Sequence, residues 1–405
     1  MYELQSVQEL KRVMKNYFQS LESRTSKIAW CTSVGPAELL RSFGFEVYFP
    51  ENHGALLGAT RQAMQYIPEA IKCGYSGHVC SYTTSDIGSF LKNETPLTKH
   101  YGLSSIPEPD LIVYNTNQCR EVEDWFTFFA DTFKCPIVGI HPPRYLDEVG
   151  LDEVNLVAKQ FQKMIPICES VSGQKFDLEK FKEVVKLSKE ATLLWQKSLR
   201  TSTAVHAPLS FFDASIHMGP IVVLRGTEIA KKYYETLLKE LENNVRTNTG
   251  FIEQPKARIF WEGMPIWGKL RMLSDLFSSN NAAVVASTYC SSWVFDQFDE
   301  NDPWISTARA YTEIFINRSE KAKMKILSDW FVEYKIDGIV YHDSKTCFNN
   351  SNAKFGMPQR LKEQTGIPAL IIEGDLCDLR FFSEGQSITK IETFLEQLEE
   401  IKMIN

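Results

Sequence analysis

The sequence predicts an α/β protein in which two parallel-sheet domains are joined by a helical connector and preceded by an N-terminal helix. Short, continuous apolar runs alternate with helical segments near both ends of the chain, as is typical of parallel strands buried on both faces. A length of 405 residues predicts two or three domains, at ~150 residues each. The expected boundaries are an N-terminal helical segment at 1–26, a first α/β domain at 27–149, the connector at 150–250 and a second α/β domain at 251–405.

The first α/β domain is expected to follow a surface helix in the N-terminal segment. That segment has helical spacing but lacks the apolar core of a secretory signal. The expected strands are residues 27–31, 46–49, 111–114 and 136–140, and the expected helices are residues 36–43, 57–73 and 121–133.

The connector is expected to be helical, and the second α/β domain to repeat the pattern of the first. Residues 111–119 resemble residues 338–347, because in each an apolar strand ends in a polar turn that holds a cysteine. Prolines and glycines within residues 206–226 indicate breaks between helices. The expected connector helices are 150–168, 176–200 and 227–245, the later strands are 257–261, 282–286, 338–341 and 369–372, and the last helix is 388–401.

Composition and charge exclude several classes of protein. The formal net charge of −7, from 44 basic and 51 acidic residues, argues against a dedicated nucleic-acid binder. Because no window approaches the ~18 apolar residues of a membrane span, we expect no membrane association and a cytoplasmic location. In the cytosol the nine cysteines are not expected to form disulfides, so some of them are candidate metal ligands or nucleophiles.

Three cysteines are candidate ligands of an iron–sulfur cluster. Cys119 and Cys347 follow predicted strands, where ligands bind in open α/β sheets, and Cys80 lies in a polar stretch rich in turn residues. Three thiolates from separate loops could hold three irons of a [4Fe–4S] cluster and leave the fourth iron open. The alternative is that each is a buried thiol, since the wide spacing is not diagnostic. No Cys-x-x-Cys is present, which argues against a zinc ribbon or a thioredoxin-like site. Buried thiols are the preferred interpretation for Cys31, Cys73, Cys135, Cys168, Cys290 and Cys377.

Polar side chains near two other strand ends are candidate catalytic groups. Ser33 could bind a carbonyl or anion, although it or Thr32 could equally cap the next helix. Glu51 would face the same cleft and could move a proton, or could be an ordinary loop acceptor. His53 and His342 flank this cleft and could donate to a cluster sulfur or protonate substrate, although a lone histidine is more often structural.

A partial nucleotide-binding pattern is not expected to bind ATP. Residues 263–270 nearly match the phosphate-binding loop, but Leu270 replaces the hydroxyl that ligates magnesium. Pro265 and Trp267 also occupy a loop that depends on small residues and free N–H groups. Any ATP hydrolysis is therefore expected on a separate chain.

Six motifs together give the chain a resemblance to a known family. They are WCTSVGPAELL at 30–40, YFPENH at 48–53, GYSGHVCSY at 74–82, NTNQC at 115–119, DGIVYHDSKTC at 337–347 and IEGDLCDLR at 372–380. Through them the chain resembles the core subunits of the benzoyl-CoA reductase and 2-hydroxyacyl-CoA dehydratase family over nearly its whole length.

The resemblance implies a fold, a cofactor and partners. Members contain flavodoxin- or Rossmann-like α/β domains with a [4Fe–4S] cluster between them, and its ligands fall on Cys80, Cys119 and Cys347. The active-site serine and glutamate of the dehydratase branch fall on Ser33 and Glu51. Two homologous iron–sulfur subunits pair as a heterodimer, and a separate ATP-hydrolysing activator donates low-potential electrons. The substrate is an acyl-CoA.

Three functions remain open on these grounds. Residues 34–36, 52–55, 216–226 and 345–352 are more like the reductase branch, so a subunit of an ATP-dependent aromatic acyl-CoA reductase of the benzoyl-CoA type is expected first. The alternative within the family is a subunit of an (R)-2-hydroxyacyl-CoA dehydratase that works through a ketyl radical. The alternative from another class is a non-catalytic scaffold or small-ligand-binding protein that kept the two-domain fold.

Overall fold

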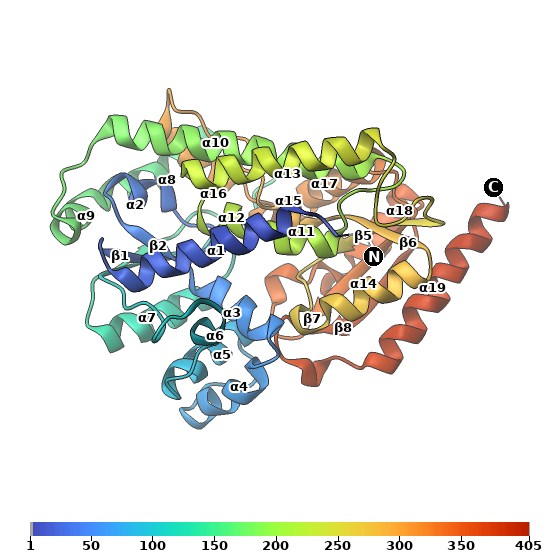
Figure 1. Cartoon of the computed structure of the whole chain (residues 1–405), viewed down its shortest axis with the longest axis horizontal. Coiled ribbons are helices and arrows are strands. Elements are labelled where there is room, and N and C mark those ends of the chain that lie inside the picture. Colours follow the sequence, from blue (N-terminus) through green and yellow to red (C-terminus); the bar gives the residue numbers. More distant parts are fainter. Residues whose placement is uncertain (1–2, 405) are drawn as a thin grey trace.

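Two four-stranded parallel sheets form the framework of the protein (Figure 1). The computed structural model describes residues 3–404. The strand order is β2-β1-β3-β4 in the first sheet and β6-β5-β7-β8 in the second, so the two halves share one topology. This confirms the predicted fold class and the similarity between the halves. Within the described residues, no helix is both long enough and apolar enough to cross a membrane.

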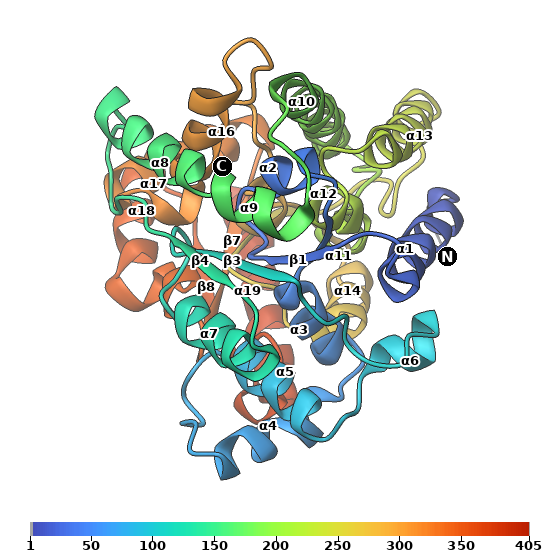
Figure 2. The same cartoon turned by 90° about the vertical axis from the view of Figure 1, so that its left-hand side faces the viewer.

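The first sheet is built from short strands with helices on both faces, and β1 and β3 at its centre are fully buried. Figure 2 shows α7 on one face of this sheet and α2 on the other. We call this sheet and its helices the first lobe. Its elements are β1 (Ile28–Cys31), α2 (Ala37–Ser42), β2 (Glu46–Tyr48), α3 (Pro50–Ala59), α4 (Ala63–Lys72), α5 (Ser81–Leu91), α6 (Pro96–Tyr101), β3 (Leu111–Asn115), α7 (Glu121–Phe133) and β4 (Ile137–Ile140).

The helical middle of the chain packs along the first lobe. The long helices α10 and α13 lie side by side at the top of Figure 1, and α10 also packs on α2. The short helix α11 ends at His217 and the short helix α12 begins at Gly219. This break lies within residues 206–226, where breaks between helices were predicted. The helices are α8 (Leu151–Lys163), α9 (Ile165–Ser172), α10 (Leu178–Arg200), α11 (Phe211–His217), α12 (Gly219–Val223) and α13 (Glu228–Arg246).

The second sheet and its helices α14, α15 and α17–α19 form what we call the second lobe. The chain between α15 and α17 includes α16, which packs against α8 of the helical middle. Its elements, with α16, are β5 (Ala257–Glu262), α14 (Leu270–Ser279), β6 (Ala282–Ser287), α15 (Thr288–Ser291), α16 (Pro303–Thr312), α17 (Glu320–Glu333), β7 (Gly338–Ser344), α18 (Met357–Thr365), β8 (Ala369–Gly374) and α19 (Glu384–Ile404).

The N-terminal helix α1 (Ser6–Ser23) packs against the rest of the protein and is not a separate surface element. Its apolar stripe is buried, including Leu10, Val13 and Phe18, and it contacts α12, α13, α6 and β2. In Figure 1 it runs across the front of the molecule. The helix therefore ties the first lobe to the helical middle of the chain.

Two predicted helices are divided in the structure, and the one expected at 150–168 is α8 and α9, which meet at Met164. The helix expected at 57–73 is two helices, since the chain turns at Thr60–Gln62 between α3 and α4. The polar stretch around Cys80, which is rich in turn and cap residues, was assigned no element from the sequence, and after Cys80 it forms the buried helix α5. Two of its hydroxyl groups bond back to carbonyls one turn earlier, Ser85 Oγ to Ser81 O at 2.6 Å and Thr84 Oγ1 to Cys80 O at 3.3 Å, so these two stay satisfied on burial.

Candidate functional site

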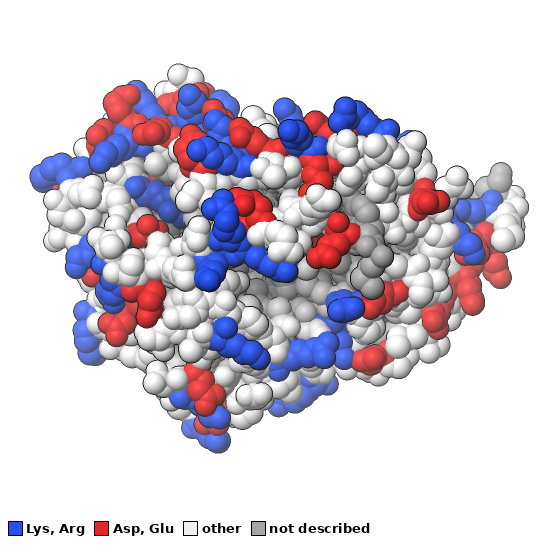
Figure 3. Space-filling model, viewed as in Figure 1, with Lys and Arg blue, Asp and Glu red and all other residues white. Residues whose placement is uncertain are grey.

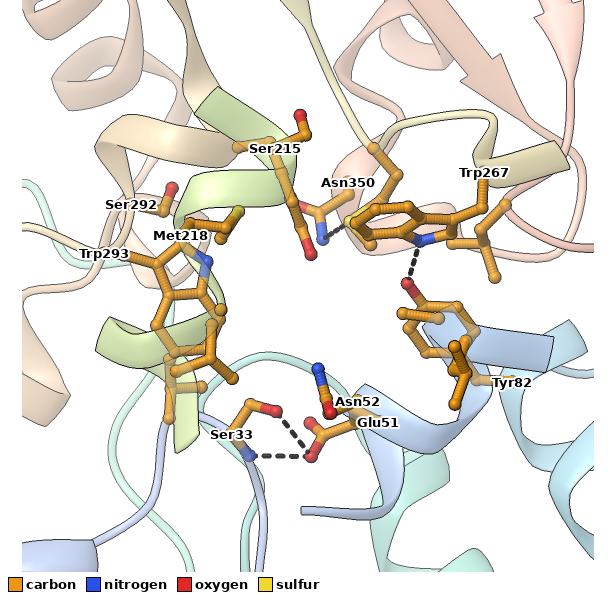
Figure 4. A pocket seen from close by; sticks show the side chains of 18 of the residues that line it. Ser33, Glu51, Asn52, Tyr82, Ser215, Met218, Trp267, Ser292, Trp293 and Asn350 are labelled. Carbon is orange, nitrogen blue, oxygen red and sulfur yellow. Dashed lines mark hydrogen bonds between the residues drawn. The ribbon is translucent and has the colours of Figure 1, made fainter. Parts of the chain in front are cut away.

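A cavity of about 400 Å³ lies where the two lobes meet. Segments that follow β1, β2 and β3 contribute to its wall, as do segments that follow β5, β6, β7 and β8. The carboxyl ends of both parallel sheets thus face one space, as expected for ligand sites in open α/β sheets. Figure 4 shows Ser33 and Glu51 on one side of it and Trp267, Tyr82 and Trp293 around it.

The three candidate cluster ligands all line this cavity. Cys80 directly precedes α5, Cys119 follows β3 and Cys347 follows β7, and none of them is in a disulfide. Burial raises the pKa of Cys80 to about 12. Burial also raises the pKa of Cys119. The charge of Glu121 raises this pKa further, and the charges of Cys80 and Cys347 add smaller increases. Burial therefore favours the neutral thiol at all three positions, and a bound cation would favour the thiolate.

The donor set fits a thiophilic cluster better than a single ion. Among residues 3–404, no group of three or more His, Cys, Asp or Glu side chains is arranged to hold one metal ion. A [4Fe–4S] cluster has its cysteine ligands on different irons, so they need not meet at one point. Three free cysteines from separate loops, facing one cavity, match that requirement.

Ser33 and Glu51 form a hydrogen-bonded pair in the cavity wall. The Ser33 main-chain N–H and hydroxyl both donate to Glu51 Oε2, at 2.7 and 3.0 Å, and the Gln118 amide donates to Oε1. Burial raises the pKa of Glu51 to about 7, although these three hydrogen bonds oppose the rise. The carboxyl group can therefore gain or lose a proton near neutral pH.

Neither Ser33 nor Thr32 caps helix α2, so the capping role that the sequence left open for them is not found. The residue at the start of α2 is Pro36, without a side-chain cap, and Thr32 accepts a hydrogen bond from the main-chain N–H of Asn115 at 3.0 Å. Gln118 was not singled out from the sequence as a cavity residue. Its position directly before Cys119, just beyond a strand end, was the available signal.

The structure does not bring His53 or His342 into the cavity. His53 is 1% exposed, its Nδ1 pairs with Asp86 and its Nε2 meets Thr95 Oγ1 at 2.8 Å. The indole of Trp125 also donates to Asp86, at 2.8 Å, so His53 belongs to a buried network behind the wall. The ring of His342 is buried as well, with Nδ1 at 2.7 Å from the Met264 carbonyl. Both histidines were expected to flank the cleft and to be able to reach a cluster or substrate, but neither lines the cavity.

The remaining cysteines follow the prediction with two exceptions. Cys73 is exposed, because it lies at the end of α4 where the helix stops. Cys135 is only partly buried. The others are buried thiols, namely Cys31, Cys168, Cys290 and Cys377.

The rest of the wall is mostly apolar and was only partly foreseen. The loop after β5, which is not expected to bind ATP, contributes Met264 and Trp267, and the Trp267 indole donates to the hydroxyl of Tyr82 across the lobe junction. Helix α1 contributes Leu10 and Met14. Short-range patterns could not place α1 here, since the helix reaches the site only through tertiary packing.

One basic side chain lies in the lining of the cavity. Lys11 on α1 lines the cavity and is exposed, and Glu51 and Glu121 are the acidic residues of the lining. Figure 3 shows the surface hollowed beside α1, with both basic and acidic side chains around the hollow. Lys11 could contact an anionic group of a ligand whose apolar part lies in the cavity.

These features define an α/β protein in which the carboxyl ends of two parallel sheets face one cavity that holds three free cysteines and a buried carboxyl group. The chain belongs to the 2-hydroxyglutaryl-CoA dehydratase, D-component family, whose model matches residues 32–398.

Three relatives agree with that assignment. The chain is 30% identical to the alpha subunit of (R)-2-hydroxyisocaproyl-CoA dehydratase from Clostridioides difficile over 383 residues, covering 93% of this chain and 91% of the relative. It is also 30% identical to a subunit of benzoyl-CoA reductase from Thauera aromatica over 380 residues, covering 90% and 86%. It is 28% identical to the alpha subunit of lactoyl-CoA dehydratase from Anaerotignum propionicum over 390 residues, covering 93% and 92%. The family and enzyme class expected from the motifs, an acyl-CoA reductase or dehydratase subunit, are thereby confirmed.

Proposed function

We propose that this chain is the [4Fe–4S]-carrying subunit of an (R)-2-hydroxyacyl-CoA dehydratase. The observation that carries the proposal is that Cys80, Cys119 and Cys347 share one cavity with the Ser33–Glu51 pair. The matching family and two of the three relatives named above are of the dehydratase type, which favours loss of water over the ring reduction expected first from the sequence.

Cys80, Cys119 and Cys347 would hold the cluster through their thiolates. When bound, the cluster would supply an electron of low potential and an open iron for the substrate oxygen. We further propose that the electron reaches this chain from a separate ATP-hydrolysing activator. A homologous iron–sulfur subunit is the proposed permanent partner.

The cavity wall would bind the acyl group and exclude water. Trp267, Tyr82, Trp293 and Met264 give the substrate an apolar surface. Exclusion of water strengthens every electrostatic interaction inside the site, because the effective dielectric constant falls. Lys11 in the cavity lining would attract the phosphates of a coenzyme A thioester.

Glu51 is the proposed base at the acyl chain. With a pKa raised to about 7 by burial, it can take a proton from the carbon adjacent to the one that bears the leaving hydroxyl group, and this proton and the leaving hydroxide together make the water that is released. Ser33 donates two hydrogen bonds to Glu51 Oε2, one from its N–H and one from its hydroxyl. These bonds fix the orientation of the Glu51 carboxylate, and so the direction of the lone pairs that could accept the substrate proton. The Ser33 hydroxyl can rotate to donate to a substrate oxygen once substrate is bound.

The first test is the metal content of single cysteine variants. After anaerobic preparation, the unmodified chain is expected to hold about four irons and an equal amount of sulfide. Cys80→Ser, Cys119→Ser and Cys347→Ser are each expected to lose most of the iron, because each removes one ligand. Cys135→Ser is the matched control, since Cys135 is free but does not line the cavity. An unmodified chain without iron or sulfide would contradict the proposal.

A second candidate is an aromatic acyl-CoA reductase subunit. The specific observation in its favour is the benzoyl-CoA reductase relative, which is as similar as the isocaproyl-CoA dehydratase relative. Incubation with partner, activator and both substrate types separates the candidates: an enoyl-CoA product indicates the dehydratase, and a reduced ring indicates the reductase. If neither product forms and the three cysteine variants still support the partner, the chain is a scaffold.

A further inference from the structure

We propose that Asp375 and Thr346 are positioning residues that lock the Cys80 loop of the first lobe to the Cys347 loop of the second. Their hydrogen bonds would fix the separation of two cysteine ligands that belong to different lobes. The proposal rests on the proposed function, since it assigns a role to these residues in holding the cluster.

Asp375 is the centre of this arrangement. It follows β8, its side chain is fully buried, and its two carboxylate oxygens accept hydrogen bonds from both lobes. Ser81, the residue after Cys80, donates its hydroxyl to Oδ1 at 2.5 Å. The neighbouring main-chain N–H groups of Cys377 and Asp378 donate to the same oxygen, at 3.2 and 3.1 Å.

Thr346, the residue before Cys347, joins the same carboxylate and also reaches across. Its main-chain N–H and its hydroxyl donate to Asp375 Oδ2, at 2.8 and 2.7 Å. The same hydroxyl oxygen accepts a hydrogen bond from the main-chain N–H of Ser81 at 3.0 Å. One hydroxyl group therefore connects the chain beside Cys80 with the chain beside Cys347.

The contribution of Asp375 is geometric. A buried carboxylate that accepts hydrogen bonds from Ser81 in the first lobe and from Thr346 in the second restricts the relative position of the two lobes.

A separate link connects the third cysteine loop. One Arg144 Nη atom donates to the Gln118 carbonyl and to the Asn349 side-chain oxygen, both at 3.3 Å. Gln118 precedes Cys119, and Asn349 lies just beyond Cys347. The Cys347 loop is thus tied to both other cysteine loops, and the Asp375–Thr346 lock is the shorter of the two links.

The test compares variants of Thr346 in the full chain. Thr346→Val keeps the shape but removes both hydroxyl bonds, whereas Thr346→Ser keeps the hydroxyl. After anaerobic reconstitution, the valine variant is expected to release iron to a chelator about tenfold faster than the unmodified chain, and the serine variant to match the unmodified chain. Equal release by all three would overturn the proposal.

Asp375→Asn provides a second variant with a matched control. An amide places N–H groups against donors, so iron release is expected to accelerate as in the valine variant. Asp378→Asn is the control, because Asp378 is equally buried but its side chain bonds only within the Asp378–Arg380 turn. If both asparagine variants release iron alike, Asp375 has only a general structural role and the proposal fails.

Cross-linking of cysteines in the metal-free chain tests the role of Asp375 and Thr346 independently of whether the chain binds a cluster. In the metal-free chain, a short bifunctional thiol reagent is expected to link Cys80 to Cys347, with the linked peptides counted by mass spectrometry. The yield is expected to fall in Thr346→Val and to recover in Thr346→Ser. An unchanged yield in the valine variant overturns the lock whatever the iron content. A reduced yield in a chain that never binds iron supports the lock and overturns the cluster.

Discussion

At Glu51, burial and hydrogen bonding act on one carboxyl group in opposite directions. Removal from water disfavours the charged form, while the Ser33 N–H, the Ser33 hydroxyl and the Gln118 amide favour it. Burial is the larger effect, and the pKa rises to about 7. A general base with this pKa is half deprotonated at the pH where it would work.

Glu51→Gln is expected to lower turnover by about 100-fold or more while leaving the iron content unchanged. Because the base form increases as pH rises through about 7, turnover of the unmodified enzyme should increase over the same range, and the glutamine variant should lose that dependence. Rates measured from pH 5.5 to 8.5, about 1.5 units on either side of the pKa, check both points. Glu123→Gln is the control, because this carboxylate of α7 does not line the cavity. Full activity in Glu51→Gln would remove Glu51 from the mechanism.

His53 is expected to contribute to stability and not to chemistry. His53→Gln should lower the free energy of unfolding by about 1–3 kcal/mol, because the buried Asp86 carboxylate and the Thr95 hydroxyl lose a fixed partner. Turnover per folded enzyme should stay unchanged. Urea unfolding followed by fluorescence gives the first quantity and steady-state kinetics the second, with the exposed His78→Gln as control. A large fall in turnover without a stability loss would return His53 to the active site.

At the scale of elements, α4 and α5 pack unusually closely beside the cavity. A Cβ atom on Gly88 of α5 would lie 2.0 Å from the Tyr66 carbonyl oxygen of α4, a distance that no side chain can accept without backbone movement. Since α5 begins directly after Cys80, movement of α5 would also displace that ligand.

Gly88→Ala is therefore expected to destabilise the protein by more than about 2 kcal/mol and to lower its iron content. Gly385→Ala is the matched control, because Gly385 lies in α19 with open space around it and alanine is the better helix former. The control should leave stability equal or slightly higher. Thermal unfolding and iron analysis of the two variants check this, and equal behaviour would show that α4 and α5 can separate without cost.

The elements that the sequence predicted well are those with strong periodicity. The helix expected at 121–133 is α7 with the same bounds, and the strand expected at 111–114 is β3 with one more residue. Helix α5 was not predicted, because serine and threonine have low helix propensity and its stability comes from burial and tertiary partners. The break between α3 and α4 was missed since no proline or glycine marks Thr60–Gln62.

At the scale of the whole molecule, a buried ion pair joins three distant segments. Arg225 at the end of α12 and Glu38 on α2 are both fully buried, with Arg225 Nε 3.2 Å from Glu38 Oε1. Tyr311 on α16 completes the group, because its hydroxyl accepts from Arg225 Nε at 2.9 Å and donates to Glu38 Oε2 at 2.6 Å. The arginine also donates to the Gly35 carbonyl at 2.9 Å, which fixes the chain two residues beyond Ser33.

Arg225→Met is expected to destabilise the protein by about 3–5 kcal/mol, because it leaves the Glu38 carboxylate buried without its cation. The double variant Glu38→Gln/Arg225→Met should recover part of that loss, since no buried charge remains. Denaturant unfolding of the single and double variants measures the difference. If the double variant is as unstable as the single one, packing of the arginine rather than its charge is responsible.

The sequence by itself determined the α/β class, the repeated strand pattern, the family and the residue types at the strand ends, because periodicity and short motifs are local properties of the chain. Only the tertiary structure decided that α1 and the loop after β5 line the cavity. It also decided that Glu51 is hydrogen-bonded to Ser33 and Gln118, and that His53 belongs to a buried hydrogen-bond network. The physical reason is that burial, and with it the pKa of Glu51 and the contacts of Asp375, depends on which distant segments pack together.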